Sequence, residues 1–209
     1  MPRQVDPLQR RRQVAEALLR VVDAEGLDAA SIPRIARELG ATTGLVQAYF
    51  RSKDELLLFA FDHLADLVNE RVDAALADTA HEGIDERLLR SMSVLASADE
   101  DEQDSEGRIW LAFLARAAFH PVLRERHVAG AEMIRVRCQH AFEVARSLGQ
   151  VDEVLDPRIE SVALTAFADG IALQRALEPE LVTKEAARRM LRGHLARIFT
   201  ATPDGREHR

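Results

Sequence analysis

The spacing of apolar residues predicts a chain built almost entirely of helices. Apolar positions recur every three or four residues along most of its length, and the β-branched and aromatic runs typical of strands are missing. We therefore expect an all-α fold. Nine helices are predicted, over residues 7–24, 31–39, 43–50, 53–77, 85–98, 105–119, 121–148, 157–177 and 183–199.

Capping residues mark the ends of several predicted helices. Ser31 is a good N-cap, and Gly40 ends the helix that Ser31 begins. Ser52 precedes the fourth helix and Glu55 follows three residues later, which is the pattern of a capping box. At about 1.5 Å per residue, the fourth helix would be about 40 Å long. It would therefore connect the N-terminal helices to the rest of the chain.

Charge divides the chain into two parts. The net charge is −7, yet residues 1–53 carry nine basic and six acidic groups, whereas residues 54–209 carry 19 basic and 29 acidic groups. A basic patch on one small end is suited to docking on phosphate. We expect a small domain over residues 1–52, a larger helical domain over 53–200, a solvated acidic loop over 99–106 and a frayed tail over 201–209.

Several classes of protein are excluded by what the sequence lacks. Its single cysteine, Cys138, cannot form a disulfide within the chain. No secretory signal and no run of about 18 apolar residues is present, so we expect a cytoplasmic protein that does not span a membrane. The seven histidines have no metal-binding spacing, and the common catalytic and nucleotide-binding motifs are missing, so we expect no metal, no cofactor and no catalysis. An all-α enzyme is kept as an alternative only because a ligand cavity could in principle perform chemistry.

The segment ATTGLVQAYFRSKDELL, residues 41–57, predicts the second helix of a helix-turn-helix, after the turn at Gly40. Val46 and Phe50 lie four residues apart and would pack on the two preceding helices. The outward face would carry hydroxyl, amide and phenol groups with almost no charge, a composition that suits the reading of base edges. The residues on this side are Thr43, Leu45, Gln47 and Tyr49.

Positive charge flanks the predicted recognition helix. Lys53 would stand at the start of the fourth helix, where free N–H groups and the helix dipole already favour an anion such as phosphate. Arg10, Arg11 and Arg12 could reach phosphates or an adjacent minor groove, although they could equally form an ordinary solvated helix start. Gly44 would let the beginning of the recognition helix approach the DNA backbone closely.

The stretch IARELGATTGLVQAYFRSKDELL closely resembles the signature of TetR-type transcriptional regulators, because the turn glycine, aromatic pair, lysine and leucine pair are in register. The pattern covers residues 8–60. The segments RIWLAFLARAAFHPVLRERH and AFADGIALQRALEPELVTKEAARRML resemble the C-terminal domain of BetI-type members. The resemblance implies that Tyr49 and Lys53 bind phosphate and that the residues nearest the bases are Thr42, Thr43, Leu45 and Gln47. The family usually has an aromatic residue in place of Gln47, so we expect a changed base preference.

The function implied is that of a homodimeric, one-component regulator, most simply a repressor. It would bind pseudo-palindromic double-stranded operator DNA and be released by an unknown small molecule. The alternative is a helical dimer that binds a protein partner or has lost DNA binding. A steep dependence of DNA binding on salt would separate the two, since phosphate contacts release counterions.

Two further sets of residues are predicted in the larger domain. Trp110 and Phe113 lie one helical turn apart, beside Arg116, and suggest an apolar wall with a polar handle. For each candidate the alternative is an ordinary core or surface role. The candidate ligand-binding residues are Phe61, Met92, Trp110, Phe113, Arg116, Met133, Arg137 and Gln174. By analogy with the family, the candidate dimer-interface residues are Val162, Ala166, Phe167, Gly170, Met190, Leu191, Leu195 and Ile198.

Overall fold

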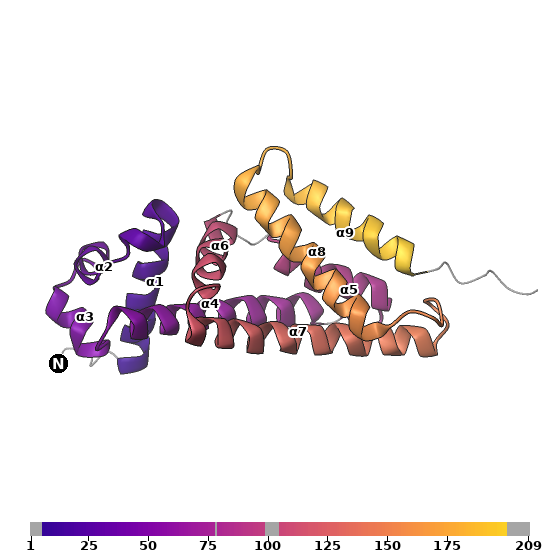
Figure 1. Ribbon diagram of the computed structural model, residues 1–209, viewed down its shortest axis with the longest axis horizontal. Helices are drawn as coiled ribbons and strands as arrows, with labels where there is room; N and C mark the ends of the chain where they lie inside the picture. The colour runs from indigo at the N-terminus through magenta and orange to yellow at the C-terminus, as the bar shows by residue number, and fades with distance from the viewer. Residues whose placement is uncertain (1–5, 78, 99–104, 200–209) are drawn as a thin grey trace, which may run out of the picture. The chain divides into compact units, whose positions relative to one another are not determined.

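The protein is all-α, as predicted, in a computed structural model that describes residues 6–77, 79–98 and 105–199 (Figure 1). The helices of the described residues are α1 (Pro7–Glu25), α2 (Ile32–Leu39), α3 (Thr43–Tyr49), α4 (Lys53–Leu76), α5 (Ile84–Leu95), α6 (Ser105–Ala117), α7 (Pro121–Ser147), α8 (Pro157–Leu177) and α9 (Lys184–Ile198). A short 3₁₀ turn, Leu27–Ala29, was not predicted. Most of the predicted acidic loop, residues 99–104, and the predicted tail lie outside the described residues.

The predicted caps are present in the structure, and they account for the close agreement between the predicted and observed helix ends. The Ser31 hydroxyl accepts a hydrogen bond from the N–H of Arg34, and Gly40 adopts a left-handed conformation with φ of 67° at the turn between α2 and α3. The Ser52 hydroxyl accepts from the N–H of Glu55 at 3.0 Å. The predicted capping box is altered in its second half, because the Glu55 carboxylate accepts from the N–H of Arg51 at 2.8 Å.

The described chain forms two compact units that divide the sequence differently from the predicted domains. The N-terminal unit contains the residues up to Asn69 together with Ser105–Val128, and the body unit contains the remainder. Most of α4, the whole of α6 and the beginning of α7 therefore belong with the helix-turn-helix. Their apolar residues extend its core, as the burial of Leu56, Phe113 and Leu123 shows.

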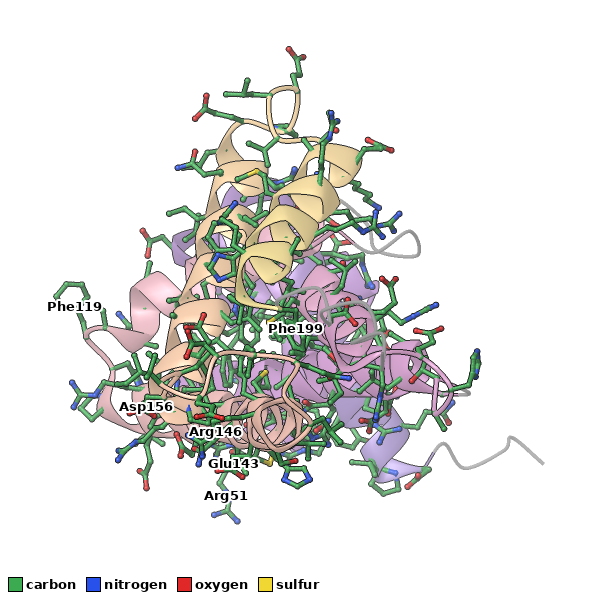
Figure 2. The ribbon with its side chains drawn as sticks, turned by 90° about the vertical axis from the view of Figure 1, so that its right-hand side faces the viewer. Arg51, Phe119, Glu143, Arg146, Asp156 and Phe199 are labelled. Atoms are coloured by element: carbon green, nitrogen blue, oxygen red, sulfur yellow. The ribbon has the colours of Figure 1, made fainter. Side chains whose placement is uncertain are left out.

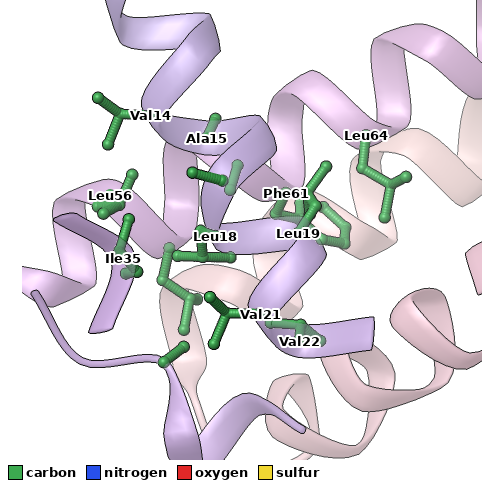
Figure 3. Packing of buried hydrophobic residues seen from close by; sticks show 14 of the residues in the cluster. Val14, Ala15, Leu18, Leu19, Val21, Val22, Ile35, Leu56, Phe61 and Leu64 are labelled. Carbon is green, nitrogen blue, oxygen red and sulfur yellow. The ribbon is translucent and has the colours of Figure 1, made fainter. Parts of the chain in front are cut away.

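The core of the N-terminal unit is formed by side chains that converge from α1, α2 and α4 (Figure 3) and from their neighbours. Helix α1 contributes a whole face of buried aliphatic residues, including Val14, Leu18 and Val21, which meets Ile35 of α2 and Leu56 of α4. As predicted, Val46 and Phe50 are buried in this core. Because burial of apolar area contributes about 25 cal/mol per Å², this shared core holds α3 in place although α3 has only seven residues.

The core of the body unit is mainly aliphatic and is supplied by α5, α7, α8 and α9. Its fully buried members include Phe142, Leu164 and Leu191. One charged residue, Arg175, is 6% exposed and donates to the carbonyl oxygens of Ser97 at 2.7 Å and Val182 at 2.8 Å. These bonds satisfy a guanidinium that would otherwise be costly to bury, and they join the end of α5 to the turn between α8 and α9.

Candidate DNA-binding surface and ligand cavity

Helix α3 presents the mixed polar face that the sequence predicts. Thr43 and Gln47 are exposed, Leu45 and Tyr49 are half-buried, and Val46 on the opposite side is fully buried. Thr42 is the N-cap of α3, and its hydroxyl accepts from the N–H of Leu45 at 3.2 Å, so that oxygen is already engaged within the helix. A methyl group at Gly44 would meet only the Thr42 hydroxyl, at 3.9 Å, so the start of the helix is open to an approaching ligand.

Arg11 has a role inside the N-terminal unit that sequence analysis missed. Its guanidinium donates to the backbone oxygen of Tyr49 and to the carboxylate of Glu55, both at 3.1 Å. It also lies 4.4 Å above the ring of Phe50 and 4.7 Å from that of Phe59. One side chain from α1 therefore fixes the end of α3 and the beginning of α4.

Glu55 is held in its charged form at this junction. The N–H of Arg51 and the guanidinium of Arg11 both donate to its carboxylate, and they lower the pKa of that group. The partner of Arg11 thus stays ionised at neutral pH, so the predicted phosphate contact of Arg11 would have to compete with an existing ion pair.

The basic residues near the helix-turn-helix divide into paired and unpaired groups. Arg34 pairs with Glu25 and Glu38 at 2.7 and 3.0 Å, and Arg20 also contacts Glu38 at 3.1 Å. These bonds lower the pKa of Glu38, with the contribution of Arg34 the larger. Within the described residues 6–53, the cations without an ion-pair partner are Arg10, Arg12, Arg37, Arg51 and Lys53.

Arg51 is a cation that sequence analysis did not single out. It is exposed, it lies two residues before Lys53, and Figure 2 shows its side chain extending away from the ribbon. Lys53 is also exposed and is the first residue of α4. Arg12 is exposed on α1 and Arg10 is half-buried. The neutral face of α3 is therefore followed directly in the chain by two exposed positive charges, neither of which forms a salt bridge within the described residues. The position of Arg51 two residues before Lys53 could have identified it from the sequence.

The body unit contains a cavity of about 400 Å³ between α4, α5 and α7. Its apolar wall is aliphatic, and in the described residues no Phe, Tyr or Trp lines it. The wall consists of Val72 and Leu76 from α4, Ile84, Leu88, Met92 and Leu95 from α5, and Ile134, Cys138, Ala141 and Val144 from α7. A volume of this size is typical of sites that hold small molecules.

The polar residues of the cavity are few, and two of them neutralise each other. Asp73 and Arg137 form an ion pair of 3.0 Å, with both side chains more than half exposed. Arg87 is exposed, and its guanidinium has no hydrogen bond or ion pair among the described residues. Ser91 donates to the backbone oxygen of Arg87, so its hydroxyl hydrogen is engaged.

The eight predicted ligand-binding residues are not brought together. Met92 and Arg137 line the cavity, whereas Phe61, Trp110 and Phe113 belong to the N-terminal unit. There Phe61 stacks on Trp110 with ring centroids 5.3 Å apart and tilts against Phe113 at 5.7 Å, so the aromatic group extends the core. The remaining three, Arg116, Met133 and Gln174, are exposed and do not line this cavity.

Helix α8 has an exposed apolar stripe, whereas part of the predicted dimer surface is internal. Leu191 and Leu195 of α9 are 0% and 3% exposed and lie in the core of their own unit. They are therefore not included in the interface proposed below. Phe167 and Ile198 are half-buried, and Met190 is 42% exposed. The stripe on α8 consists of Ile159, Val162, Ala163, Ala166, Gly170, Leu173 and Leu177, all exposed.

His194 of α9 lies beside this stripe in an apolar setting. Its ring stacks on Phe167 with centroids 4.6 Å apart, and its Nε2 is 3.7 Å from a carboxylate oxygen of Glu160. Burial lowers the pKa of His194, and this effect outweighs the opposing attraction of Glu160. The imidazole therefore favours its neutral form, which is compatible with an apolar surface.

Neither a metal cluster nor a membrane-spanning helix occurs among the described residues. No group of three or more His, Cys, Asp or Glu residues is arranged to hold a metal ion in that part of the chain. None of its helices combines the length and apolar character needed to cross a membrane.

Known proteins resemble this chain in sequence. Residues 15–59 match the family model of bacterial regulatory proteins of the tetR family, and residues 85–200 match that of the BetI-type transcriptional repressor C-terminal domain. Over 199 residues the chain is 31% identical to the HTH-type transcriptional regulator PksA of Bacillus subtilis (strain 168), covering 95% of this chain and 94% of PksA.

Solved structures of transcriptional regulators have a similar fold. A transcriptional regulator from Rhodococcus sp. Rha1 is 28% identical, with a TM-score of 0.78 over 90% of this chain and 95% of that one. A regulator from Saccharomonospora viridis, solved in complex with choline, is 22% identical, with a TM-score of 0.81 over 91% of this chain and 98% of that one.

Proposed function

Because the chain belongs to the TetR family of transcriptional regulators, which are not enzymes, we propose how its own residues carry out regulation. The observation that supports the proposal best is the exposed neutral face of α3 followed by two unpaired cations, Arg51 and Lys53. In this proposal α3 enters the major groove, where the amide of Gln47 reads a base edge and Thr43 and Leu45 contact neighbouring bases. Tyr49, Arg51 and Lys53 bind the phosphates on either side.

We propose that the active form is a homodimer joined through the apolar stripe of α8 and Met190 of α9. The support is the exposure of a continuous row of apolar and small residues, which a single chain leaves in contact with water. A two-fold dimer presents two copies of α3 to the half-sites of a pseudo-palindromic operator. Because operator DNA is in the cytoplasm, we also place the protein there.

The proposed regulation is repression that a small molecule relieves. Helix α4 begins at Lys53 and contributes Val72, Asp73 and Leu76 to the cavity, so one continuous helix includes both a phosphate-binding residue and part of the ligand site. A molecule that binds the cavity more tightly in one conformation shifts the population of dimers toward a half-site spacing that does not fit DNA.

Choline, the ligand of the structural neighbour from Saccharomonospora viridis, is one candidate for this chain. Quaternary ammonium groups are generally recognised by the faces of aromatic rings. The aliphatic lining of the cavity does not favour a ligand of that class.

The DNA-binding proposal is tested by a gel-shift titration with the chain's own upstream DNA at several salt concentrations. We expect Lys53→Ala combined with Tyr49→Phe to weaken binding to all sequences. The slope of log K against log salt should fall by about 0.9 for each phosphate that the variant no longer neutralises. Lys184→Ala is the matched control, since Lys184 is likewise the first residue of a helix but lies in the body unit. Equal effects of the double change and of Lys184→Ala, or the absence of specific binding, would contradict the proposal.

The dimer proposal is tested with two helical glycines. An added Cβ meets nothing within 4 Å at Gly170 on the α8 stripe or at Gly130 on α7, so a single chain has room for a side chain at both positions. We expect Gly170→Arg to produce monomers in sedimentation experiments and Gly130→Arg to leave dimers intact. A dimer that survives Gly170→Arg would show that α8 is not the interface.

A further inference from the structure

The cavity of the body unit indicates the chemical class of the regulatory ligand. Resting on the proposed function, we propose that the ligand is an aliphatic acid, with a saturated apolar body in the cavity and one anionic head that pairs with Arg87. Three properties of the site lead to this class: its aliphatic wall, its volume and the charges at its rim.

The wall excludes strong binding of an organic cation. Quaternary ammonium groups gain affinity from the negative faces of aromatic rings, and no Phe, Tyr or Trp lines the cavity within the described residues. Among the described lining residues the carboxylate is that of Asp73, and it is already paired with Arg137 at 3.0 Å. A cation would therefore find neither an aromatic cage nor an uncompensated negative charge.

The same wall favours a saturated body of modest length. Valine, leucine, isoleucine and methionine side chains surround the space, and transfer of each CH₂ group from water to such surroundings is favourable. At about 30 Å³ for each water-sized group, a cavity of this volume accommodates about a dozen non-hydrogen atoms. A carboxylic acid with about ten carbons meets this limit.

The charge at the rim favours a negative head. The Asp73–Arg137 pair cancels, and His140 is 3.9 Å from Glu143, which leaves Arg87 as the uncompensated charge on the lining in the described part of the chain. A guanidinium can bind a carboxylate through two parallel hydrogen bonds. The exposure of Arg87 places the head at the water-facing edge, with the apolar body against the aliphatic wall.

Cys138 provides a direct reading of cavity occupancy. It is the single cysteine of the chain, it lines the cavity, and it is 3% exposed. Burial raises the pKa of its thiol to about 11, so labelling by a small neutral thiosulfonate is run under mildly alkaline conditions. An occupant of the cavity blocks the reagent, whereas a molecule bound elsewhere does not.

The test titrates the full chain with decanoate, 1-decanol and choline by calorimetry and follows thiosulfonate labelling of Cys138. We expect decanoate at about ten times its dissociation constant to slow labelling about tenfold, because about one site in eleven is then free. Choline should leave the labelling rate unchanged. Tight binding of choline, or failure of decanoate to protect Cys138, would overturn the assignment.

The role of Arg87 is tested separately from that of the wall. Arg87→Met should weaken decanoate about tenfold through removal of one charge-assisted interaction while leaving 1-decanol unchanged. Equal weakening for the two compounds would overturn the proposed anionic head. Arg90→Met on the same helix is the control, since Arg90 pairs with Glu82 at 2.7 Å and does not line the cavity.

Gel shifts without ligand keep this inference distinct from the proposed function. Specific operator binding without decanoate binding overturns the ligand class and leaves DNA recognition intact. Decanoate binding by a chain that does not bind operator overturns the proposed function and leaves the ligand class intact.

Discussion

The two compact units of this protein are built from the same kind of helix and are packed in different ways. In the N-terminal unit, aromatic and aliphatic side chains from α1, α2, α3, α4 and α6 fill a shared core. In the body unit, the aliphatic side chains of α4, α5 and α7 leave a cavity of about 400 Å³ between these helices. The first arrangement fixes a short helix whose exposed face must keep its geometry. The second leaves volume for a molecule that the chain does not supply, at a cost in dispersion contacts.

The largest loss of stability is expected from a substitution in the tightly filled core of the N-terminal unit. Phe50 is 1% exposed, lies under Arg11 and packs edge-on against Phe59 at 5.5 Å. Phe50→Ala should lower the free energy of unfolding by about 3–5 kcal/mol, as measured by urea denaturation. Phe119→Ala in the same unit is the control, because Phe119 is 89% exposed and points away from the ribbon in Figure 2. Its effect should stay within about 0.5 kcal/mol, and similar effects of the two changes would contradict the described packing.

A smaller change in stability should distinguish a packed position of the body unit from a position at its cavity. Ala145 and Ala141 lie one turn apart on α7; Ala145 is 0% exposed, and Ala141 lines the cavity. Ala145→Leu should destabilise the protein by about 1–3 kcal/mol through overpacking. Ala141→Leu should be neutral or stabilise it by up to about 1 kcal/mol, because the added atoms enter the cavity. Thermal unfolding measures both, and a large decrease in stability for Ala141→Leu would mean that the cavity cannot accept the added atoms.

The smallest of the three effects concerns the junction of α3 and α4. Arg11→Met keeps most of the stem of the side chain but removes the bonds to Tyr49 and Glu55, so it should cost about 1–2 kcal/mol of stability. Arg12→Met should leave stability unchanged, because the described structure gives Arg12 no partner. Denaturation curves separate the two substitutions. A decrease in DNA affinity with unchanged stability for Arg11→Met would instead assign Arg11 to phosphate binding.

Local features of the fold were predictable because they depend on neighbours in the sequence. Ser31, Gly40 and Ser52 determine where helices begin or end through contacts within four residues, and the α8 boundaries were predicted without error. The faces of α3 followed from the spacing of Val46 and Phe50. These predictions needed only helix periodicity and the chemistry of caps.

Long-range features were missed for a physical reason. Arg11 reaches groups 38 and 44 residues away, so no local pattern reveals its partners. The cavity depends on how incompletely three helices fill the space between them, which residue spacing does not specify. Trp110 and Phe113 were therefore assigned to a ligand wall although they extend the N-terminal core, and the aliphatic residues that line the cavity resembled ordinary core.

The scarcity of lysine gives this protein a chemical handle. Lys53 and Lys184 are the chain's two lysines, and each is the first residue of its helix. An amine-reactive reagent therefore modifies few places besides the α-amino group, and one of them is the exposed start of α4. Mass spectrometry of acylated peptides can follow the two side chains separately, with Lys184 as an internal standard. Protection of Lys53 then becomes a footprint of bound operator, obtained without labelling the DNA.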